Sequence, residues 1–166
     1  MRAILLGLAC AAMTLAGCAT AGGSTAAQAP AYYVMRHLQK ADGPDPALSA
    51  EGAANAQRLA ALFEGRAKPQ AIYVSTTRRA RETAAPLAAR LGLTPKEYNP
   101  TDTAAVVARV RAEPGPVLIV GHSNTVPDIV AALGGPRPAP LADSDYGAVW
   151  MVTKDGKTEQ LALKLS

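Results

Sequence analysis

Short apolar runs alternate along the chain with longer segments in which apolar residues recur at helical spacing. The runs over residues 32–35, 71–74 and 117–120 have the length of strands. The last run, Val-Leu-Ile-Val, is apolar at every position, as expected of a central parallel strand that is buried on both faces. Strands that alternate with helices predict an α/β fold, a three-layer sandwich with a mostly parallel central sheet and helices on both faces.

Local signals set the expected bounds of these elements. Ser49 can cap a helix whose apolar stripe comprises Ala53, Leu59, Leu62 and Phe63. Gly92 is expected to end a helix, and Asp155-Gly156 to join two late strands as a hairpin. The predicted strands are 32–35, 71–74, 93–98, 117–120, 148–153 and 158–163, and the predicted helices run from Ser49 to Phe63 and over residues 79–91, 103–112 and 125–133.

The N-terminus predicts export. Residues 3–16 form a run of about 14 apolar or small residues, which is too short to span a bilayer and has the length of a signal-peptide core. The run ends in Leu15-Ala16-Gly17-Cys18, which resembles the bacterial lipobox, in which the thiol of the cysteine is acylated. An ordinary signal peptide with an accidental cysteine is the alternative. Because Ala19 rather than aspartate follows, the resemblance implies an outer-membrane anchor that faces the periplasm.

These signals divide the chain into three parts. Residues 1–17 are predicted to be a lipoprotein signal peptide, and residues 18–30, which are small and uncharged, to be a flexible tether. Residues 31–166 have the length of one domain. Cys10 lies in the part that would be removed, so Cys18 is the only cysteine expected in the mature chain, which excludes disulfides and thiol catalysis.

The charge pattern argues against nucleic acid as a partner. The formal net charge is only +4, and the chain has one Phe, one Trp and five Tyr, so basic residues are not interleaved with aromatic ones. The domain offers two histidines and no cysteine, which is too few nitrogen and sulfur ligands for a zinc site. We therefore expect no metal and no cofactor.

The two histidines stand at equivalent places. His37 follows the first predicted strand through Arg36, and His122 follows residues 117–120 through Gly121. The carboxyl ends of strands are where α/β proteins place their ligands. Although a lone loop histidine is common, two at strand ends favour a shared site.

Three segments carry a family resemblance: Arg36-His37, the run Ser75-Thr76-Thr77-Arg78-Arg79-Ala80-Arg81-Glu82-Thr83-Ala84, and Gly121-His122-Ser123. In order and spacing they resemble the signatures of the histidine phosphatase superfamily, the phosphoglycerate mutase-like branch. The similarity extends over about residues 32–152. It departs from the family at Leu38, where relatives have glycine, and at Gln39, where many have an acid.

The resemblance implies the role of each residue. His37 would be the nucleophile, Arg36 and Arg79 the phosphate clamps, and His122 a second imidazole that stabilises the phosphoryl group. The chemistry agrees, because a neutral imidazole is nucleophilic near pH 7 and arginine grips two phosphate oxygens at once. The proton donor for the leaving group is less clear: Asp102 is the best-placed candidate, followed by Glu97 and Asp128.

The expected activity is therefore hydrolysis of a phosphorylated small molecule or phosphoprotein through a phosphohistidine. A domain this short leaves no room for a large lid, so an open site is expected. One alternative is a serine hydrolase with Ser123 as nucleophile, but no histidine follows Ser123 and Thr125 replaces the second glycine of the Gly-x-Ser-x-Gly motif. The stronger alternative, prompted by Leu38 and Gln39, is a non-catalytic phosphate-binding or scaffold lipoprotein.

Overall fold

The structure is a computed structural model that describes residues 31–166. The predicted signal peptide, the acylation site Cys18 and the tether of residues 18–30 lie outside the described residues. Within residues 31–166, no helix combines the length and the apolar character needed to cross a bilayer.

A single six-stranded sheet forms the middle of the domain, with strand order β3-β2-β4-β1-β5-β6. The strands are β1 (Ala31–Arg36), β2 (Ala71–Ser75), β3 (Lys96–Tyr98), β4 (Val117–Gly121), β5 (Ala148–Thr153) and β6 (Thr158–Ala162). Strands β1 to β4 are parallel to one another, whereas β5 and β6 are antiparallel to their neighbours. The prediction of a mostly parallel sheet is confirmed.

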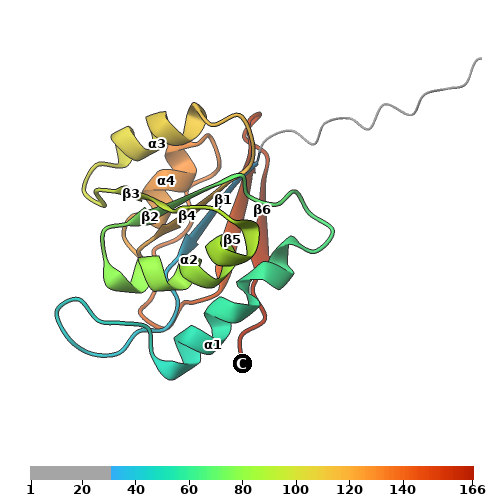
Figure 1. The fold of residues 1–166 in the computed structure, drawn as a ribbon. Coiled ribbons are helices and arrows are strands. Elements are labelled where there is room, and N and C mark those ends of the chain that lie inside the picture. Colours follow the sequence, from blue (N-terminus) through green and yellow to red (C-terminus); the bar gives the residue numbers. More distant parts are fainter. Residues whose placement is uncertain (1–30) are drawn as a thin grey trace, which may run out of the picture.

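Helices cover both faces of this sheet (Figure 1). One face is covered by α1 (Ala50–Arg58), the 3₁₀ helix η1 (Leu59–Phe63) and α2 (Arg78–Leu91), and the other by α3 (Thr103–Arg111) and α4 (Val126–Ala132). Each face has its own hydrophobic core. The predicted three-layer sandwich is therefore confirmed.

The alternation of side chains along the strands explains why the central runs are apolar throughout. In β1, Tyr33 and Met35 pack into the core under α1 and α2, and Tyr32 and Val34 into the core under α3 and α4. Residues of β2 and β4 divide between the two cores in the same way. Because successive side chains point to opposite faces, a strand covered on both sides needs apolar residues at every position.

The local signals are found where the sequence predicts them. The Ser49 hydroxyl accepts a hydrogen bond of 3.0 Å from the backbone N–H of Gly52 and so caps α1. Gly92 ends α2 in the left-handed region at φ 66°, a conformation that side chains with a Cβ rarely adopt. Gly156, at φ 83°, turns the chain between β5 and β6.

Two predictions of local structure are wrong. Strand β3 begins at Lys96 rather than at residue 93, because the backbone N–H of Leu93 is already bonded to Ala88 at the end of α2, and Pro95 has no N–H to donate to a sheet. Ala53 is exposed, because the buried face of α1 passes through Gly52 and Ala56 instead.

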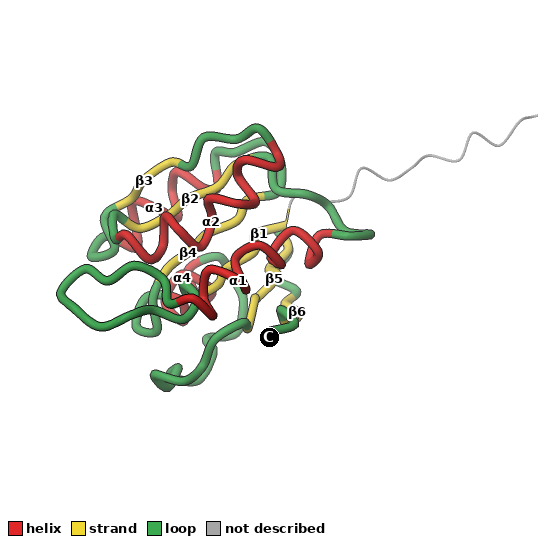
Figure 2. The backbone as a smooth tube through the Cα atoms, turned by 60° about the horizontal axis from the view of Figure 1, so that its bottom comes forward, coloured by secondary structure: helices red, strands yellow, loops and turns green. Residues whose placement is uncertain are grey.

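The connection between β1 and α1 bears on the site. Residues 37–49 leave the carboxyl end of β1 as a loop that projects from one end of the domain (Figures 1 and 2). A single antiparallel bridge between Lys40 and Leu48 closes its base.

Candidate active site

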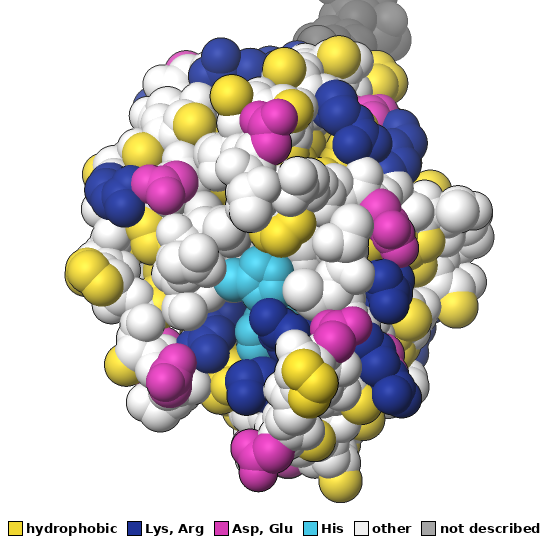
Figure 3. Space-filling view, turned by 90° about the vertical axis from the view of Figure 1, so that its left-hand side faces the viewer, with side chains coloured by type: hydrophobic (Ala, Val, Ile, Leu, Met, Phe, Trp, Pro, Cys, Tyr) yellow, Lys and Arg dark blue, Asp and Glu magenta, His cyan; other side chains and the backbone are white. Residues whose placement is uncertain are grey.

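The carboxyl ends of β1, β2 and β4 are neighbours in the sheet and open into a pocket of about 340 Å³. We call it the strand-end pocket. Its lining residues are Arg36, His37, Lys40, Thr77, Arg79, Pro100, Thr101, His122, Ser123, Asn124, Thr125 and Asp143. In the space-filling view the two histidines lie at the centre of this face, with lysine and arginine side chains beside them (Figure 3).

His37 is held in one tautomer. Its Nδ1 lies 2.8 Å from the carbonyl oxygen of Leu38, which can only accept, so Nδ1 carries the proton. Nε2 therefore keeps its lone pair. The backbone N–H of His37 donates to the carbonyl of Gly121 at 2.9 Å, which ties the end of β1 to the end of β4. A buried imidazole with one fixed N–H and one free nitrogen is the arrangement that a histidine nucleophile needs.

The Leu38 peptide that holds His37 is itself fixed by α2. The buried hydroxyl of Thr83 accepts a hydrogen bond of 3.0 Å from the backbone N–H of Leu38 and donates one of 2.8 Å to the carbonyl of Arg79. Thr83 thus links the loop that follows β1 to α2, the helix that carries Arg79.

His122 is oriented by the end of β2. Its Nε2 lies 2.8 Å from the hydroxyl of Ser75, which in turn lies 3.1 Å from the hydroxyl of Thr77. On the other side of the ring, Nδ1 lies 3.4 Å from Nη2 of Arg79. Because a guanidinium only donates, Nδ1 is the acceptor and Nε2 donates to Ser75. The centroids of the two imidazole rings are 5.3 Å apart, so they share one site, as the sequence predicts.

Burial lowers the pKa of both histidines. The pKa of His37 falls to about 4, chiefly because the ring is buried. The hydrogen bond to the carbonyl of Leu38 raises this pKa, and the nearby His122, Arg79 and Arg36 lower it further. The pKa of His122 also falls to about 4, through burial and then the charges of Arg79 and Arg36. Both rings are therefore neutral at pH 7, and Nε2 of His37 is unprotonated.

Arg36 and Arg79 reach the same pocket from β1 and α2. In each, the Nε–H is buried and has no hydrogen-bond partner among residues 31–166. A buried donor without a partner is costly, and two such donors in one pocket indicate a site for an anion. Carboxylates lie at the rim: Asp45 is 3.6 Å from Nη1 of Arg79, and Asp143 is 3.7 Å from Nη2 of Arg36.

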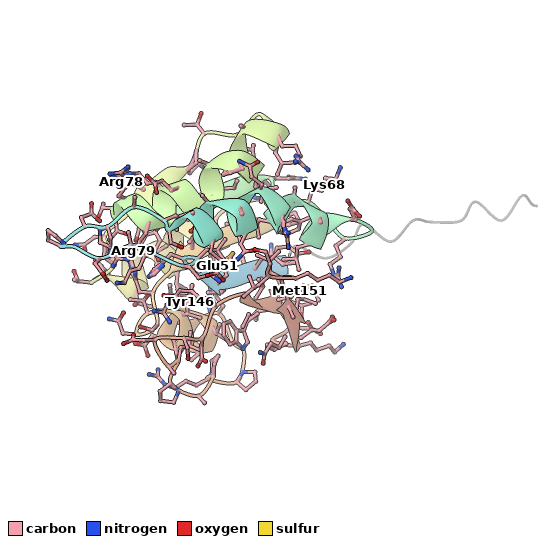
Figure 4. The ribbon with its side chains drawn as sticks, turned by 90° about the horizontal axis from the view of Figure 1, so that it is seen from below. Glu51, Lys68, Arg78, Arg79, Tyr146 and Met151 are labelled. Carbon is pink, nitrogen blue, oxygen red and sulfur yellow. The ribbon has the colours of Figure 1, made fainter. Side chains whose placement is uncertain are left out.

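The neighbouring Arg78 has a different environment. Its side chain is 58% exposed and pairs with Glu82 one turn along α2 at 2.7 Å, whereas the side chain of Arg79 is 19% exposed. Arg78, Arg79 and Tyr146 all lie at the end of the molecule where the β1–α1 loop projects (Figure 4). Of the two arginines, Arg79 alone lines the pocket, in agreement with the register that the sequence predicts.

The structure does not bring the three candidate acids into the pocket. The carboxylate of Asp102 accepts a hydrogen bond of 2.9 Å from the backbone N–H of Ala105 and caps α3. Glu97 pairs with Arg81 at 3.4 Å, and Asp128 pairs with Arg137. Of the carboxylates in residues 31–166, Asp143 lines the pocket.

Leu38 and Gln39 also lie away from the strand-end pocket. The side chain of Leu38 is fully buried in the core under α1 and α2. The amide of Gln39 donates to Glu51 at 2.9 Å, and its carbonyl oxygen accepts from Asn55 at 3.3 Å. Both departures from the family pattern therefore serve the packing of α1 and leave the pocket open.

Several residues of the site are not predicted by the sequence analysis. Ser75 and Thr83 stand inside the second motif, and that position is the signal that could have identified them. Lys40, Asp143 and Tyr146 have no such signal: Lys40 and Asp143 line the pocket from loops, and Tyr146 contacts Arg36. Tyr146 packs its ring against Arg36, with Cζ of Arg36 4.4 Å from the ring centroid.

Among the described residues, the site does not support a serine nucleophile or a metal centre built from its own side chains. Ser123 lines the pocket, but the imidazole beside it, His122, is bonded to Ser75 and Arg79. Within residues 31–166, no group of three or more His, Cys, Asp or Glu side chains is arranged to hold a metal ion.

The fold is shared with solved phosphatase structures. The protein histidine phosphatase SixA complexed with tungstate is 20% identical, with a TM-score of 0.61 over 80% of this chain and 96% of that one. A mycobacterial glucosyl-3-phosphoglycerate phosphatase is 18% identical, with a TM-score of 0.61 over 83% of this chain and all of that one. A protein described as mycobacterial hydrolase 2 is 18% identical, with a TM-score of 0.64 over 83% and 93%. At these identities the likeness establishes the fold.

Part of the sequence matches a known family model. Residues 33–101 match the model of the histidine phosphatase superfamily (branch 1), a span that includes Arg36, His37 and Arg79. No curated protein sequence matches the chain with significance. His122 lies beyond the matched span, and the structure places it beside His37. Over residues 33–101 the chain is therefore similar to the histidine phosphatase superfamily (branch 1), and its fold is that of solved phosphatases.

Proposed function

We propose that this protein hydrolyses a phosphomonoester or a phosphoramidate through a phosphohistidine on His37, and that it does so in the cell envelope. One observation carries the proposal. A neutral histidine with a free Nε2 lies in one pocket with two arginines whose buried Nε–H groups have no partner among the described residues. The nucleophile and the charge that phosphoryl transfer requires are thus already assembled.

The reaction has two steps. Nε2 of His37 attacks phosphorus, and the bond from phosphorus to the leaving oxygen or nitrogen breaks while the leaving atom takes a proton from solvent water. A second water then attacks the phosphohistidine, gives up a proton to solvent, and releases orthophosphate and the neutral imidazole. In both steps Arg36 and Arg79 lie where they can stabilise the equatorial phosphoryl oxygens, and His122 contacts the guanidinium of Arg79 at 3.4 Å.

The residues that line the pocket favour a substrate that inserts only its phosphoryl group. Pro100 is the one apolar side chain of the lining, so the pocket offers no apolar wall to a large leaving group. A phosphorylated protein side chain or a polar phosphometabolite fits this description. One solved relative of the same fold is a protein histidine phosphatase and another acts on a sugar phosphoglycerate, which supports testing both classes.

The activity is tested on the full-length protein with a panel of phosphometabolites and a phosphohistidine peptide. We expect release of orthophosphate that survives excess EDTA and is inhibited by vanadate, a mimic of the five-coordinate transition state. Labelled substrate quenched in base, where phosphohistidine survives, should leave label on His37. Phosphate binding without turnover would instead support the scaffold alternative, and label on Ser123 would support the serine hydrolase.

The envelope location rests on the lipobox-like segment that ends at Cys18. If Cys18 is acylated, the full-length protein should partition into detergent and incorporate a palmitate analogue, because stable anchoring needs more than one acyl chain. The variant Cys18→Ser should remain an unprocessed precursor. Correctly cleaved, soluble protein from that variant would show an ordinary signal peptide.

A further inference from the structure

Arg36 is held by a segment of the chain more than a hundred residues away. Its Nη1 donates to three backbone carbonyl oxygens, those of Ala142 at 2.7 Å, Asp143 at 3.2 Å and Asp145 at 3.3 Å. These three bonds saturate Nη1. The Nε–H, which has no partner among residues 31–166, and Nη2 remain for a ligand.

The ring of Tyr146 packs against the guanidinium of Arg36. Its ring centroid lies 4.4 Å from Cζ of Arg36 and 6.1 Å from the ring centroid of His37. A cation at this distance from an aromatic centroid is attracted by the negative charge above the ring. Arg36 is 4% exposed, so this attraction acts in a partly desolvated site, where it is stronger.

Residues 142–145 form a turn closed by their own hydrogen bonds. The backbone N–H of Asp145 donates to the carbonyl of Ala142 at 3.0 Å, and the carboxylate of Asp145 accepts from the backbone N–H of Ala142 at 2.7 Å. Directly after Tyr146, Gly147 takes a positive φ of 80°, and its carbonyl accepts from Leu163 at 2.8 Å. The turn is thereby tied to the C-terminal end of the chain.

We infer that Tyr146, together with the turn of residues 142–145, is a positioning element for Arg36. It fixes the guanidinium so that Nε and Nη2 meet the phosphoryl oxygens without rearrangement. A donor that is already in place stabilises the transition state more than the bound substrate, so its loss should lower kcat rather than raise KM. This inference rests on the proposed phosphatase function.

The test compares Tyr146→Leu with Tyr146→Phe in the full-length protein. Phenylalanine keeps the ring against Arg36, whereas leucine removes it and keeps an apolar side chain. For Tyr146→Leu we expect kcat to fall about 10-fold, KM to stay within about 3-fold, and inhibition by vanadate to weaken about 10-fold. Tyr146→Phe should stay within about 2-fold of the wild type in all three.

A second variant keeps the inference testable if Tyr146→Leu does not fold. Asp145→Ala removes the carboxylate that closes the turn at an exposed position. It should lower kcat but not raise KM, as in Tyr146→Leu, and leave the melting temperature unchanged.

Equal behaviour of Tyr146→Leu and Tyr146→Phe, or an increase in KM alone, would overturn the inference. If the wild type shows no turnover, the proposed function fails, and the affinity of the same variants for vanadate by calorimetry still decides the positioning role. An unchanged affinity in Tyr146→Leu would reject it.

Discussion

Two hollows of the domain differ in size, and the smaller one holds the two histidines. A groove of about 680 Å³ lies between η1 and β6, twice the volume of the strand-end pocket. We call it the η1–β6 groove. Its lining mixes Arg58, Arg66 and Lys164 with Glu64 and Glu159 and contains no histidine. In the strand-end pocket, by contrast, buried Arg36, His37 and His122 and half-buried Arg79 line one pocket.

The difference follows from the topology. Parallel strands β2, β4 and β1 end together, so each contributes a side chain to one spot. The groove lies along β6, an edge strand that runs antiparallel to its neighbour, and no second strand end meets it there. Convergence of strand ends, rather than volume, makes a site here. The following predictions test this contrast, from the largest expected effect to the smallest.

Replacing His37 should have the largest effect. The variant His37→Ala removes the nucleophile, so turnover should fall to the background of the assay and no phosphoenzyme should be trapped. The measurement is kcat together with the base-quenched label. Hydrolysis at the wild-type rate in this variant would show that another group attacks.

Three arginine-to-alanine variants compare the two hollows directly. Arg79→Ala should lose about 3 to 4 kcal/mol of transition-state stabilisation, a drop of about two to three orders of magnitude in kcat/KM. Arg78→Ala, at an exposed ion pair, and Arg58→Ala, in the η1–β6 groove, should each change it less than about 2-fold. An equal loss at Arg78 would place the motif one residue earlier, and a large loss at Arg58 would give the groove a role in catalysis.

The buried histidines should also make the domain sensitive to acid. In the folded state the pKa values of His37 and His122 lie near 4, below the ordinary value of 6.5. Between pH 4 and 6.5 the two histidines are therefore protonated in the unfolded chain but not in the folded one. Stability is therefore full above pH 6.5 and falls as the pH drops from 6.5 toward 4, by up to about 3 kcal/mol per histidine. Urea unfolding at a series of pH values measures this slope. The double variant His37→Gln/His122→Gln should flatten it, and an unchanged slope would assign the effect to other groups.

A smaller effect is expected at Thr83. Thr83→Val keeps the shape but removes the hydroxyl that fixes the Leu38 peptide, so the buried N–H of Leu38 loses its acceptor. We expect a loss of about 1 to 3 kcal/mol in the free energy of unfolding and a fall in kcat of about 10-fold. Thr83→Ser keeps the hydroxyl and should retain most of both. If the serine variant is impaired as much as the valine variant, packing of the methyl group is the cause.

The smallest effect is expected at Asp102. As the N-cap of α3, its replacement by alanine should cost about 1 kcal/mol of stability and leave kcat within about 2-fold. Chemical denaturation and steady-state kinetics separate the two results. A fall in kcat of about 100-fold or more would restore Asp102 as the general acid.

The sequence predicts the order and type of every main element because each central strand is covered on both faces and is an uninterrupted apolar run. The bounds of the edge strands are harder to predict from the sequence. Strand β3 pairs only with β2, and its short length depends on how α2 ends at Leu93 and on Pro95. Neither is visible in hydrophobic periodicity.

The same limit applies to the site. His37, His122, Arg36 and Arg79 can be predicted because each stands at a strand end or in a motif. Asp102 stands directly before a predicted helix, where aspartate is a preferred N-cap, and that local signal is what the structure bears out. The contact of Tyr146 with Arg36 joins two segments far apart in the sequence, and no local pattern reports such a contact.

The direction of β1 gives the domain two poles. The strand begins at Ala31 and runs to Arg36, and at a rise of about 3.3 Å per residue its ends are roughly 17 Å apart. Everything that precedes Ala31 in the chain is joined to the pole opposite the strand-end pocket. A solid support, a fused protein or a lipid attached before Ala31 is therefore joined to the domain at the end of β1 away from the strand-end pocket.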